Sequence, residues 1–219
     1  MSAPDDERGP GEYASPPCFM HELQADFREM PRQLPAEVKR WRKAERERLI
    51  AARLALPADT RAAYAQTIAA KLDRLVGQPA GETVALYWPF RGEPDLRGWA
   101  ETVRARGGQI ALPVVVEKGQ PLIFRIWRPG EKLEKGVWNI PIPAAGEPVV
   151  PDIVVSPVVG FDAHNYRLGY GGGFYDRTLA TLPRRPRVIV GVGYAMQRIA
   201  TIYPHEHDIA MDAVVTEAD

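Results

Sequence analysis

The sequence predicts an α/β fold, a three-layer α/β/α arrangement in which a largely parallel, Rossmann-like sheet carries helices on both faces. Three observations support this class. From residue 83 onward, short and almost continuously apolar segments, typical of strands buried on both sides, alternate with helical segments. The 219 residues, 45% of them hydrophobic, suffice for one sizeable core. A glycine-rich loop follows one apolar segment, where proteins of this class bind their ligands.

The first 35 residues are expected to lie outside this core. They contain six prolines, and seven acidic residues against three arginines, with no sustained apolar periodicity. A few aromatic and aliphatic side chains among them suggest that part of the segment docks on another surface. We therefore expect an N-terminal extension over residues 1–35, partly disordered or docked, and an α/β domain over residues 36–219.

Two helices are expected before the sheet begins. The first starts after Pro35 and runs to Leu56, with an unusual density of lysine and arginine that, taken alone, favours a solvated face. The second follows Pro57, with Asp59 or Thr60 as its N-cap. The residues expected to face inward are Val38, Trp41, Ala44, Leu49 and Ala52 in the first helix, and Ala63, Ile68, Leu72 and Leu75 in the second.

The α/β part follows a turn rich in glycine at residues 77–81. Strands are expected where apolar residues run together, and helices where they recur at helical spacing. Residues 128–150, rich in glycine and proline, are expected to form a loop. The predicted strands are residues 83–87, 110–116, 122–127, 153–161, 188–194 and 213–216, and the predicted helices are residues 96–106 and 173–182.

Charge and cysteine content argue against several classes of protein. The 28 basic residues balance the 28 acidic ones, whereas dedicated nucleic-acid binders usually carry a basic excess. Cys18 is the single cysteine, which excludes an internal disulfide and a thiolate metal cluster. No apolar run approaches the ~20 residues that span a bilayer, and the first residues do not resemble a secretory signal. We expect a cytoplasmic protein with no nucleic-acid or membrane partner.

The segment from Arg167 to Asp176 is the strongest candidate for a functional site. Glycine allows consecutive backbone N–H groups to approach phosphate oxygens closely, and a helix that starts here adds its N-terminal dipole. Arg167 is suited to grip a phosphate, and Asp176 to hold a magnesium ion. The glycines between the two charges are Gly169, Gly171, Gly172 and Gly173. The loop therefore suits a bound polyphosphate.

Two common nucleotide-binding motifs do not fit this loop. Phe174 stands where the dinucleotide fingerprint needs glycine or alanine, and the loop lacks the lysine that ends a P-loop. A glycine-rich turn that only packs a strand closely against a helix is the remaining structural alternative.

Several motifs, in order along the chain, resemble those of the 5-formyltetrahydrofolate cyclo-ligase family, also called methenyltetrahydrofolate synthetases. The segment from Arg167 to Arg177, preceded by Gly160-Phe-Asp162, is similar to the family signature. The resemblance covers residues 38–217 and leaves the extension outside. Further similar segments are Arg42 to Arg46, Ala55-Leu56, Gly92-Glu93, Gly136 to Pro141, Gln197, Pro204 to Asp208, and Asp212.

This resemblance implies an ATP-driven ring closure. ATP phosphorylates the formyl oxygen on N5 of 5-formyltetrahydrofolate, N10 attacks the activated carbon, and loss of phosphate leaves 5,10-methenyltetrahydrofolate and ADP. Such chemistry needs positioning and charge neutralisation more than a protein nucleophile. The resemblance thus implies ATP and Mg²⁺ as cofactors, and a reduced folate and ATP as the small-molecule partners.

The resemblance also implies which residues act. Arg46, with Arg42 or Lys43 or both, would reach the triphosphate, since residues four apart share a helical face. Glu93 would accept N–H donors of the pterin beside flat aromatic side chains. The expected ATP-binding residues are Arg42, Lys43, Arg46, Arg167, Gly169, Gly171, Gly172, Gly173, Phe174 and Tyr175; the substrate-binding residues are Trp88, Glu93, Trp138, Tyr170, Gly171 and Gly172; the catalytic residues are Arg167, Tyr175 and Asp176; and the metal ligands are Asp176 and Asp208.

Some of these residues also have a purely structural interpretation. Trp88 and Trp138 are suited to the core, and Glu93 to capping the helix that begins near residue 95. His205 and His207 suit a metal pair, although the lack of a third nearby ligand favours a polar loop. For the whole chain, the alternatives are a related enzyme that acts on another N-formyl compound and a non-catalytic regulator that binds folate or nucleotide.

Overall fold

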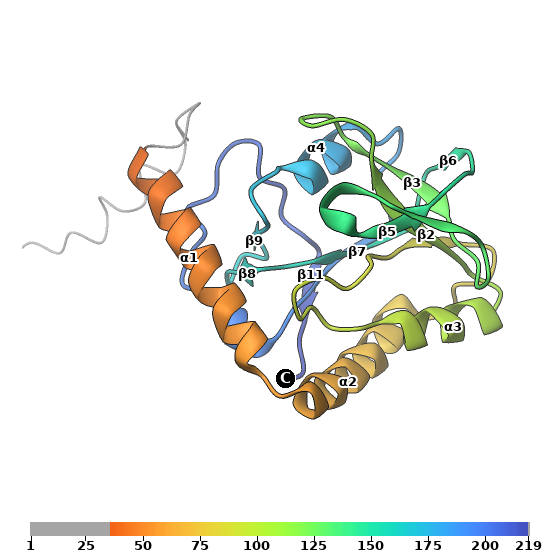
Figure 1. The fold of residues 1–219 in the computed structure, drawn as a ribbon, viewed down its shortest axis with the longest axis horizontal. Helices are drawn as coiled ribbons and strands as arrows, with labels where there is room; N and C mark the ends of the chain where they lie inside the picture. The colour runs from red at the N-terminus through yellow and green to blue at the C-terminus, as the bar shows by residue number, and fades with distance from the viewer. Residues whose placement is uncertain (1–35, 219) are drawn as a thin grey trace, which may run out of the picture.

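A seven-stranded sheet forms the centre of the computed structural model, which describes residues 36–218 (Figure 1). Its strand order is β11-β10-β7-β1-β2-β3-β6. The five strands from β11 to β2 run parallel, and β3 and β6 join antiparallel at one edge. The prediction of a largely parallel sheet is confirmed, whereas the predicted extension over residues 1–35 lies outside the described residues. The strands are β1 (Thr83–Ala85), β2 (Gln109–Val115), β3 (Leu122–Ile126), β6 (Pro148–Val149), β7 (Ile153–Pro157), β10 (Val188–Val192) and β11 (Ala213–Val215).

Helices cover both faces of the sheet, as the sequence predicts. Successive strand residues point to opposite faces, so Val84 and Leu86 pack against α2 and α3, while Ala85 packs with Leu179 of α4 on the other side. No helix within residues 36–218 combines the length and the apolar character that crossing a membrane requires. The helices are α1 (Ala36–Ala55), α2 (Ala58–Val76), α3 (Arg97–Ala105) and α4 (Phe174–Thr181).

The first helix lies beside the carboxyl end of β7 rather than over a face of the sheet (Figure 1). Its Leu49 packs against Val159, just beyond β7, and against Leu168 and Ile202. The apolar stripe predicted for this helix is wrong in detail, because Ala44 is exposed and the buried residues are Arg42, Leu49 and Arg53. The buried arginines donate to backbone carbonyls of loops at the sheet's end, and those carbonyls need donors that an apolar side chain lacks.

The second helix is also rotated relative to the prediction. Ile68 and Leu72 are buried as expected, but Ala63 and Leu75 are exposed, and Ala65 and Val76 take the inward positions. The buried set recurs every three or four residues from position 65 to 76, the period of one helical face. The predicted cap is wrong as well. The helix begins at Ala58, with Pro57 at the N-cap position and no side-chain capping bond.

The predicted strand over residues 153–161 is in fact divided between two sheets. β7 ends at Pro157, and β8 (Gly160–Phe161) pairs with β9 (Arg167–Leu168) in a small hairpin. The other predicted helices and strands match observed elements to within two residues at each end. The hairpin turns the chain away from the sheet and delivers it to the glycine-rich loop.

Residues 128–150 are more ordered than a loop. They contain the hairpin of β4 (Leu133–Lys135) and β5 (Pro141–Pro143), the short helix η3 (Val137–Asn139), and β6 at the sheet edge. Trp138 and Asn139, at the tip of the hairpin, have positive φ angles of 57° and 59°. Such backbone is uncommon outside glycine, which explains why composition alone predicts only a loop here.

Replacing Gly160 with alanine should destabilise the fold by about 1–3 kcal/mol, because the new methyl group would overpack the contact between β8 and α1. A Cβ at this position would lie 2.7 Å from Cδ1 of Leu49. Gly98 in α3 is the matched control: a Cβ there meets nothing within 4 Å, so G98A should stabilise the helix by about 0.5–1 kcal/mol. Urea unfolding measures both, and an unchanged free energy of unfolding in G160A would contradict the contact.

Candidate functional site

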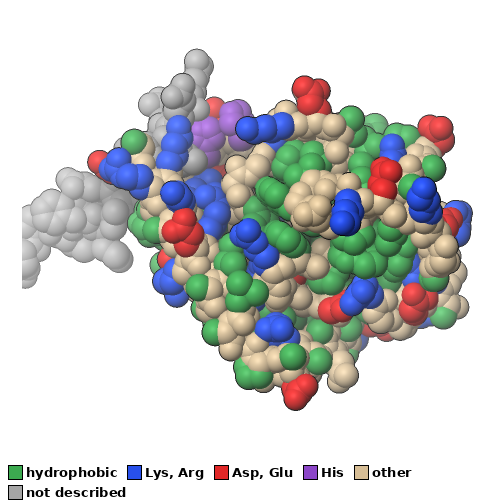
Figure 2. Space-filling model, viewed as in Figure 1, with side chains coloured by type: hydrophobic (Ala, Val, Ile, Leu, Met, Phe, Trp, Pro, Cys, Tyr) green, Lys and Arg blue, Asp and Glu red, His purple; other side chains and the backbone are tan. Residues whose placement is uncertain are grey.

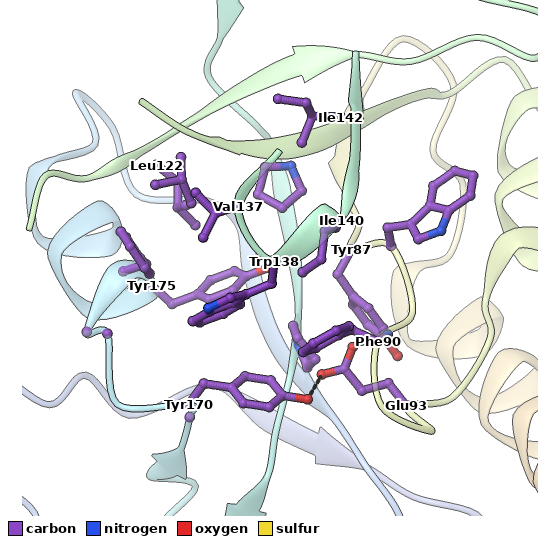
Figure 3. A pocket seen from close by; sticks show the side chains of 18 of the residues that line it. Tyr87, Phe90, Glu93, Leu122, Val137, Trp138, Ile140, Ile142, Tyr170 and Tyr175 are labelled. Atoms are coloured by element: carbon purple, nitrogen blue, oxygen red, sulfur yellow. Dashed lines mark hydrogen bonds between the residues drawn. The ribbon is translucent and has the colours of Figure 1, made fainter. Parts of the chain in front are cut away.

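A pocket opens where the carboxyl ends of β1, β2 and β7 meet the glycine-rich loop (Figure 3). This is the edge at which parallel α/β sheets place ligands. The residues that line it come from segments far apart in the sequence: Tyr87, Trp88, Phe90, Glu93, Pro113, Val115, Leu122, Val137, Trp138, Ile140, Ile142, Pro157, Arg167, Gly169, Tyr170, Gly172, Gly173, Phe174, Tyr175 and Asp176. Most of the predicted site residues therefore share one pocket.

The glycine-rich loop leads directly into α4. Gly171 and Gly173 have φ angles of 91° and 63°, a conformation that other residues adopt rarely. Gly171 also lies close to α1, since a Cβ there would be 3.4 Å from Cζ of Arg46. The positive φ angles thus favour glycine at these two positions, and Gly171 lies in van der Waals range of Arg46.

Arg46 connects α1 to this loop. Its Nε donates to the carbonyl oxygen of Gly169 at 2.6 Å. Burial lowers the pKa of its guanidinium, and the nearby Arg42 cation lowers this pKa further. The carboxylate of Asp208, 2.6 Å from Arg42, acts on this pKa in the opposite direction. Figure 2 shows the basic side chains gathered over α1 beside the histidines. The surface beside the loop therefore favours an anionic ligand.

Arg42 and Lys43 are the two alternatives for a further phosphate contact, and they differ in burial and in hydrogen bonding. Arg42 is buried and donates to Ile202 O at 2.9 Å, to Tyr203 O at 2.8 Å and to Oδ2 of Asp208 at 2.6 Å. Lys43 is exposed. Arg42 thus holds the loop that carries Asp208, while the Lys43 side chain lies in solvent.

Arg167, which is buried, and Asp176, which is partly exposed, form an ion pair at the two ends of the glycine-rich loop. Nη2 of Arg167 lies 2.7 Å from Oδ1 of Asp176, and the guanidinium also lies over the ring of Tyr175. The contact is close but poorly aligned, so both terminal nitrogens of Arg167 lack a hydrogen-bond acceptor among the described residues. Buried, unsatisfied N–H donors of this kind indicate a place for an anionic ligand.

The two predicted metal ligands lie on neighbouring segments. Asp176 accepts a hydrogen bond from the backbone N–H of Ile209, the residue after Asp208. Each carboxylate is partly exposed and each faces an arginine, Arg167 for Asp176 and Arg42 for Asp208. The structure thus brings together the predicted acidic residues and three of the predicted cations.

At the other end of the pocket, Glu93 is linked to a buried arginine through a tyrosine. Nη2 of Arg53 donates to the hydroxyl of Tyr170 at 2.7 Å, and that hydroxyl donates to Oε1 of Glu93 at 2.9 Å (Figure 3). The second oxygen, Oε2, accepts the N–H of Phe90 at 2.9 Å. Glu93 therefore does not cap α3; the carboxylate that accepts the N–H of Arg97, the first residue of α3, is that of Asp95 at 3.1 Å. The capping interpretation of Glu93 is wrong.

Burial makes Glu93 an unusual carboxyl group. It is 5% exposed, and desolvation raises its pKa to about 7, although the Arg53 charge and two hydrogen bonds act in the opposite direction. Burial likewise raises the pKa of Tyr170 and of Tyr175. The pocket thus ends in a carboxyl group that titrates near neutral pH, a property typical of functional sites.

Aromatic rings form the wall between the two ends. Trp138 stacks parallel to Phe90 at 6.1 Å between ring centroids, and Tyr170 lies 5.8 Å from both. Trp138 remains 52% exposed, so it belongs to the pocket mouth rather than to the core. Trp88 lines the pocket but also packs edge-on against Trp127, so it has both of the roles considered for it.

Sequence reasoning missed two parts of the pocket. The hairpin residues Val137, Ile140 and Ile142 carry no chemical motif, and only the fold brings them to the glycine-rich loop. Arg53, in contrast, has a signal: with Arg42, Arg46 and Leu49 it recurs at intervals of four, three and four residues, the spacing of one helical face.

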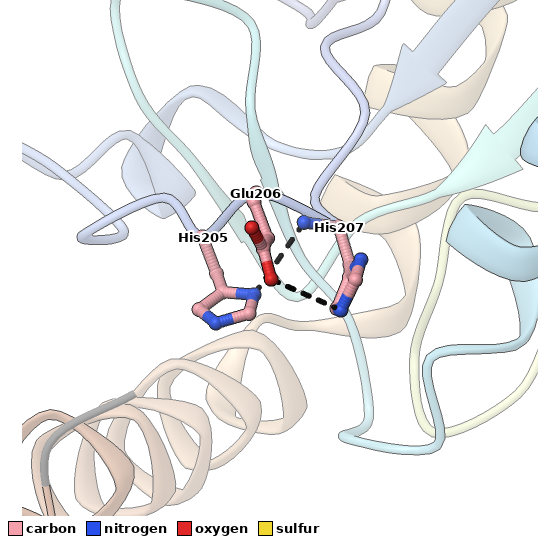
Figure 4. Close-up of side chains that lie close together, drawn as sticks. All are labelled: His205, Glu206 and His207. Carbon is pink, nitrogen blue, oxygen red and sulfur yellow. Dashed lines mark hydrogen bonds and ion pairs between the residues drawn. The ribbon is translucent and has the colours of Figure 1, made fainter. Parts of the chain in front are cut away.

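The histidines lie on a tight turn next to Asp208 (Figure 4). The N–H of Asp208 donates to His205 O, and Oδ2 of Asp208 accepts the N–H of His205. Glu206 joins the two histidines, and the three ligand atoms lie within 4.8 Å of one another. The turn alone brings consecutive side chains together, so their proximity is not by itself a metal site.

The chain is similar to known proteins in sequence and in fold. A model of the 5-formyltetrahydrofolate cyclo-ligase family matches residues 38–217. The 5-formyltetrahydrofolate cyclo-ligase of Escherichia coli (strain K12) is 34% identical over 140 residues, 61% of this chain and 77% of that protein. The NMR structure of the 5,10-methenyltetrahydrofolate synthetase of Aquifex aeolicus is similar with a TM-score of 0.69 and 30% identity, covering 81% of this chain and 90% of that one.

The 5,10-methenyltetrahydrofolate synthetase of Mycoplasma pneumoniae shares the fold, with a TM-score of 0.66 and 24% identity over 80% of this chain and 98% of that one. The family match includes the basic face of α1, Glu93, the glycine-rich loop and the turn that ends at Asp208. The chain belongs to the 5-formyltetrahydrofolate cyclo-ligase family.

Proposed function

We propose that this protein catalyses the ATP-dependent cyclisation of 5-formyltetrahydrofolate to 5,10-methenyltetrahydrofolate, with release of ADP and phosphate. One observation carries the proposal for this chain. A single pocket holds Glu93, an aromatic wall that includes Tyr170, and the charged pair Arg167 and Asp176 of the glycine-rich loop. Such a pocket can hold a flat heterocycle and a polyphosphate next to each other, which transfer of a phosphoryl group between them requires.

The nucleotide half is assigned to the loop and the basic helix. Arg167 has unsatisfied N–H groups in the pocket, and Arg46 holds its guanidinium against the loop. We assign these two arginines to the triphosphate, with the backbone N–H groups of the glycine-rich loop and the N-terminus of α4 as further donors. Arg42 then orders the loop after Ile202, and Lys43 contributes a solvated charge.

The acidic residues fit a magnesium ion. Asp176 and Asp208 are two carboxylates on adjacent segments, and Mg²⁺ usually takes one or two carboxylates and fills its other positions with water and phosphate oxygens. When bound, the ion would neutralise charge on the triphosphate. We therefore assign Asp176, with Asp208 beside it, to Mg²⁺, and Tyr175 to packing beneath the Arg167 guanidinium.

The folate half is assigned to Glu93 and the aromatic wall. An ionised Glu93 can accept two N–H donors from a 2-amino-4-oxo pyrimidine edge, while Phe90, Trp138 and Tyr170 offer flat surface to the rings. The formyl group would then lie between this wall and the loop. The chain's part in the reaction is to orient the two substrates, exclude water and stabilise the charge that develops on the transferred group.

The cellular compartment and the class of partner that we propose follow from the composition of the chain. The balanced charge and the lone Cys18 support a small-molecule enzyme of a reducing compartment, the cytoplasm, without a nucleic-acid partner.

The experiment that tests the function mixes the protein with 5-formyltetrahydrofolate and magnesium-ATP, and follows the methenyl chromophore and ADP in the same sample. We expect both to rise together and both to stop when the metal is chelated. Release of ADP without the chromophore, when another formyl compound is supplied, would indicate a shifted substrate. Binding of ATP without any turnover would indicate a regulator.

Replacing Asp176 with asparagine should raise the Mg²⁺ concentration needed for half-maximal turnover at least about tenfold, because a ligand charge is lost. The measurement is a magnesium titration at saturating ATP. D59N is the matched control, since Asp59 is exposed in the first turn of α2 and far from the pocket in the sequence. The same magnesium requirement in both variants would remove Asp176 from the metal site.

A further inference from the structure

Arg53 is the largest fully buried side chain in the described structure, and one of its partners, Tyr170, lines the pocket. Its Nη2 donates to Tyr170, its Nε donates to Arg91 O at 2.9 Å and its Nη1 to Val158 O at 3.2 Å. Val158 follows β7, and Arg91 lies two residues before Glu93. One guanidinium thus holds the end of a central strand, the turn that carries Glu93 and the tyrosine that contacts it.

The turn before Glu93 depends on this contact. Arg91 and Gly92 have φ angles of 47° and 75°, and a Cβ at position 92 would lie 3.6 Å from Cγ of Arg53. A non-glycine residue at positive φ is retained where surrounding contacts fix it. The hydrogen bond from Arg53 to the carbonyl of Arg91 is such a contact, and it fixes the backbone from which Glu93 extends.

The chain of hydrogen bonds has a fixed direction. An arginine side chain only donates, so the oxygen of Tyr170 must accept from Arg53, and the tyrosine proton is left to point toward Glu93. Glu93 then receives a donor on each oxygen, one from Tyr170 and one from the N–H of Phe90. The carboxyl group is thereby held as an acceptor, and its remaining lone pairs are left for a ligand.

We propose that Arg53 is a positioning and specificity-determining residue for the pterin subsite: together with Tyr170 it orients Glu93 and favours the ionised, accepting form of its carboxyl group, so the pocket selects a heterocycle edge that presents N–H donors. The proposal rests on the proposed function. Without Arg53, Glu93 would hold a proton at neutral pH and present a donor in place of an acceptor. A ligand edge with two N–H donors would then lose its partner.

Arg53 is the charged group that favours the ionised form of Glu93, because the other titratable groups that face Glu93 are neutral. They come from four segments around it and are all tyrosines: Tyr87, Tyr170, Tyr175 and Tyr194. Burial raises the pKa of each of them, so all four are neutral near pH 7. Arg53, with its Nη2 4.0 Å from Oε1 of Glu93, is therefore the cation that opposes the effect of burial on this carboxyl group.

The first test reads the ionisation of Glu93 without any substrate. Carbon NMR of glutamate-labelled protein, with Glu93 identified by its absence in E93Q, would follow the carboxyl signal across pH. We expect the pKa of Glu93 to rise by at least about one unit in R53M, and to rise less in Y170F, which keeps the charge but removes the bridging donor. R48M is the matched control, because Arg48 is an exposed arginine of the same helix that pairs with Glu45.

The second test separates positioning from a merely structural role. In R53M the KM for 5-formyltetrahydrofolate should rise about fivefold at pH 7, because a one-unit rise from a pKa of about 7 lowers the ionised fraction of Glu93 from about a half to about a tenth, while the KM for ATP stays within about twofold. The rise should shrink at higher pH as Glu93 ionises. R53K, which keeps the charge in a different shape, should retain much of the wild-type pH profile.

Two results would overturn the proposal. One is an unchanged Glu93 pKa in R53M or, should R53M fail to fold, in Y170F. The other is an equal rise of both KM values with no pH dependence, which would make Arg53 only an anchor for the strand ends. The NMR test does not need turnover, so a wild-type protein that is inactive on the folate would refute the proposed function and leave the link from Arg53 to Glu93 measurable.

Discussion

Replacing Arg167 with alanine should lower kcat by about 10²–10³-fold, the effect typical of removing a charged group that stabilises the transferred group in the transition state. Its guanidinium lines the pocket and pairs with Asp176 at 2.7 Å, but neither terminal nitrogen makes a well-aligned hydrogen bond within residues 36–218, so we expect phosphoryl oxygens to supply the missing acceptors. The fold should survive. Asp176, the partner left behind, is 21% exposed and still accepts the N–H of Ile209, so the free energy of unfolding should fall by only about 1–3 kcal/mol.

Two variants give this experiment its control. R167K keeps the charge but not the planar fork, so it should recover only part of the lost rate. R184A removes an exposed arginine that pairs with Asp152 outside the pocket, and it should turn over like the wild type. Steady-state kinetics with circular dichroism compare the three. A kcat in R167A close to that of R184A would show that Arg167 does not act on the transferred group.

The glycine-rich loop could be predicted from the sequence because its functional residues are close together in the chain. Arg167, the glycines and Asp176 lie within ten residues, and a strand followed by a helix fixes how they face. No long-range information is needed to infer that such a loop suits phosphate. The parallel sheet could be predicted for a similar reason, since strands buried on both faces are apolar without interruption.

The wall of the pocket could not be predicted, because it depends on contacts between distant segments. The hairpin of β4 and β5 places Trp138 beside Phe90, 48 positions away in the sequence, through a backbone conformation that composition does not reveal. The buried face of α1 could not be predicted for a different reason. Its arginines at positions 42 and 53 would normally be exposed, but here they are buried because the loops beyond the sheet expose carbonyls that need donors.

Replacing Glu93 with glutamine should raise the KM for 5-formyltetrahydrofolate by about 100-fold, since hydrogen bonds to a charged acceptor contribute about 1.5–3 kcal/mol each and one amide oxygen cannot replace a carboxylate. The KM for ATP should stay near the wild-type value, because Glu93, although it contacts the glycine-rich loop at Tyr170, lies across the pocket from Tyr175 at the start of α4 (Figure 3). E101Q, in which an exposed glutamate of α3 is replaced, is the matched control. Equal KM values in the two variants would remove Glu93 from the folate subsite.

The pH dependence of this effect follows from the ionisation of Glu93. Its pKa in the folded chain is about 7, so kcat/KM for the folate should rise with pH through this value in the wild type and should be flat there in E93Q. Stability should change in the opposite direction. Because the folded pKa lies above the ordinary 4.5, Glu93 stabilises the fold most below pH 4.5, and this contribution is lost as pH rises toward 7. Thermal unfolding across this range should therefore show a decline that E93Q lacks. The ionised form of Glu93, which we assign to substrate binding, is thus the form that destabilises the fold. Such a conflict is expected where function, rather than stability, requires a buried carboxylate.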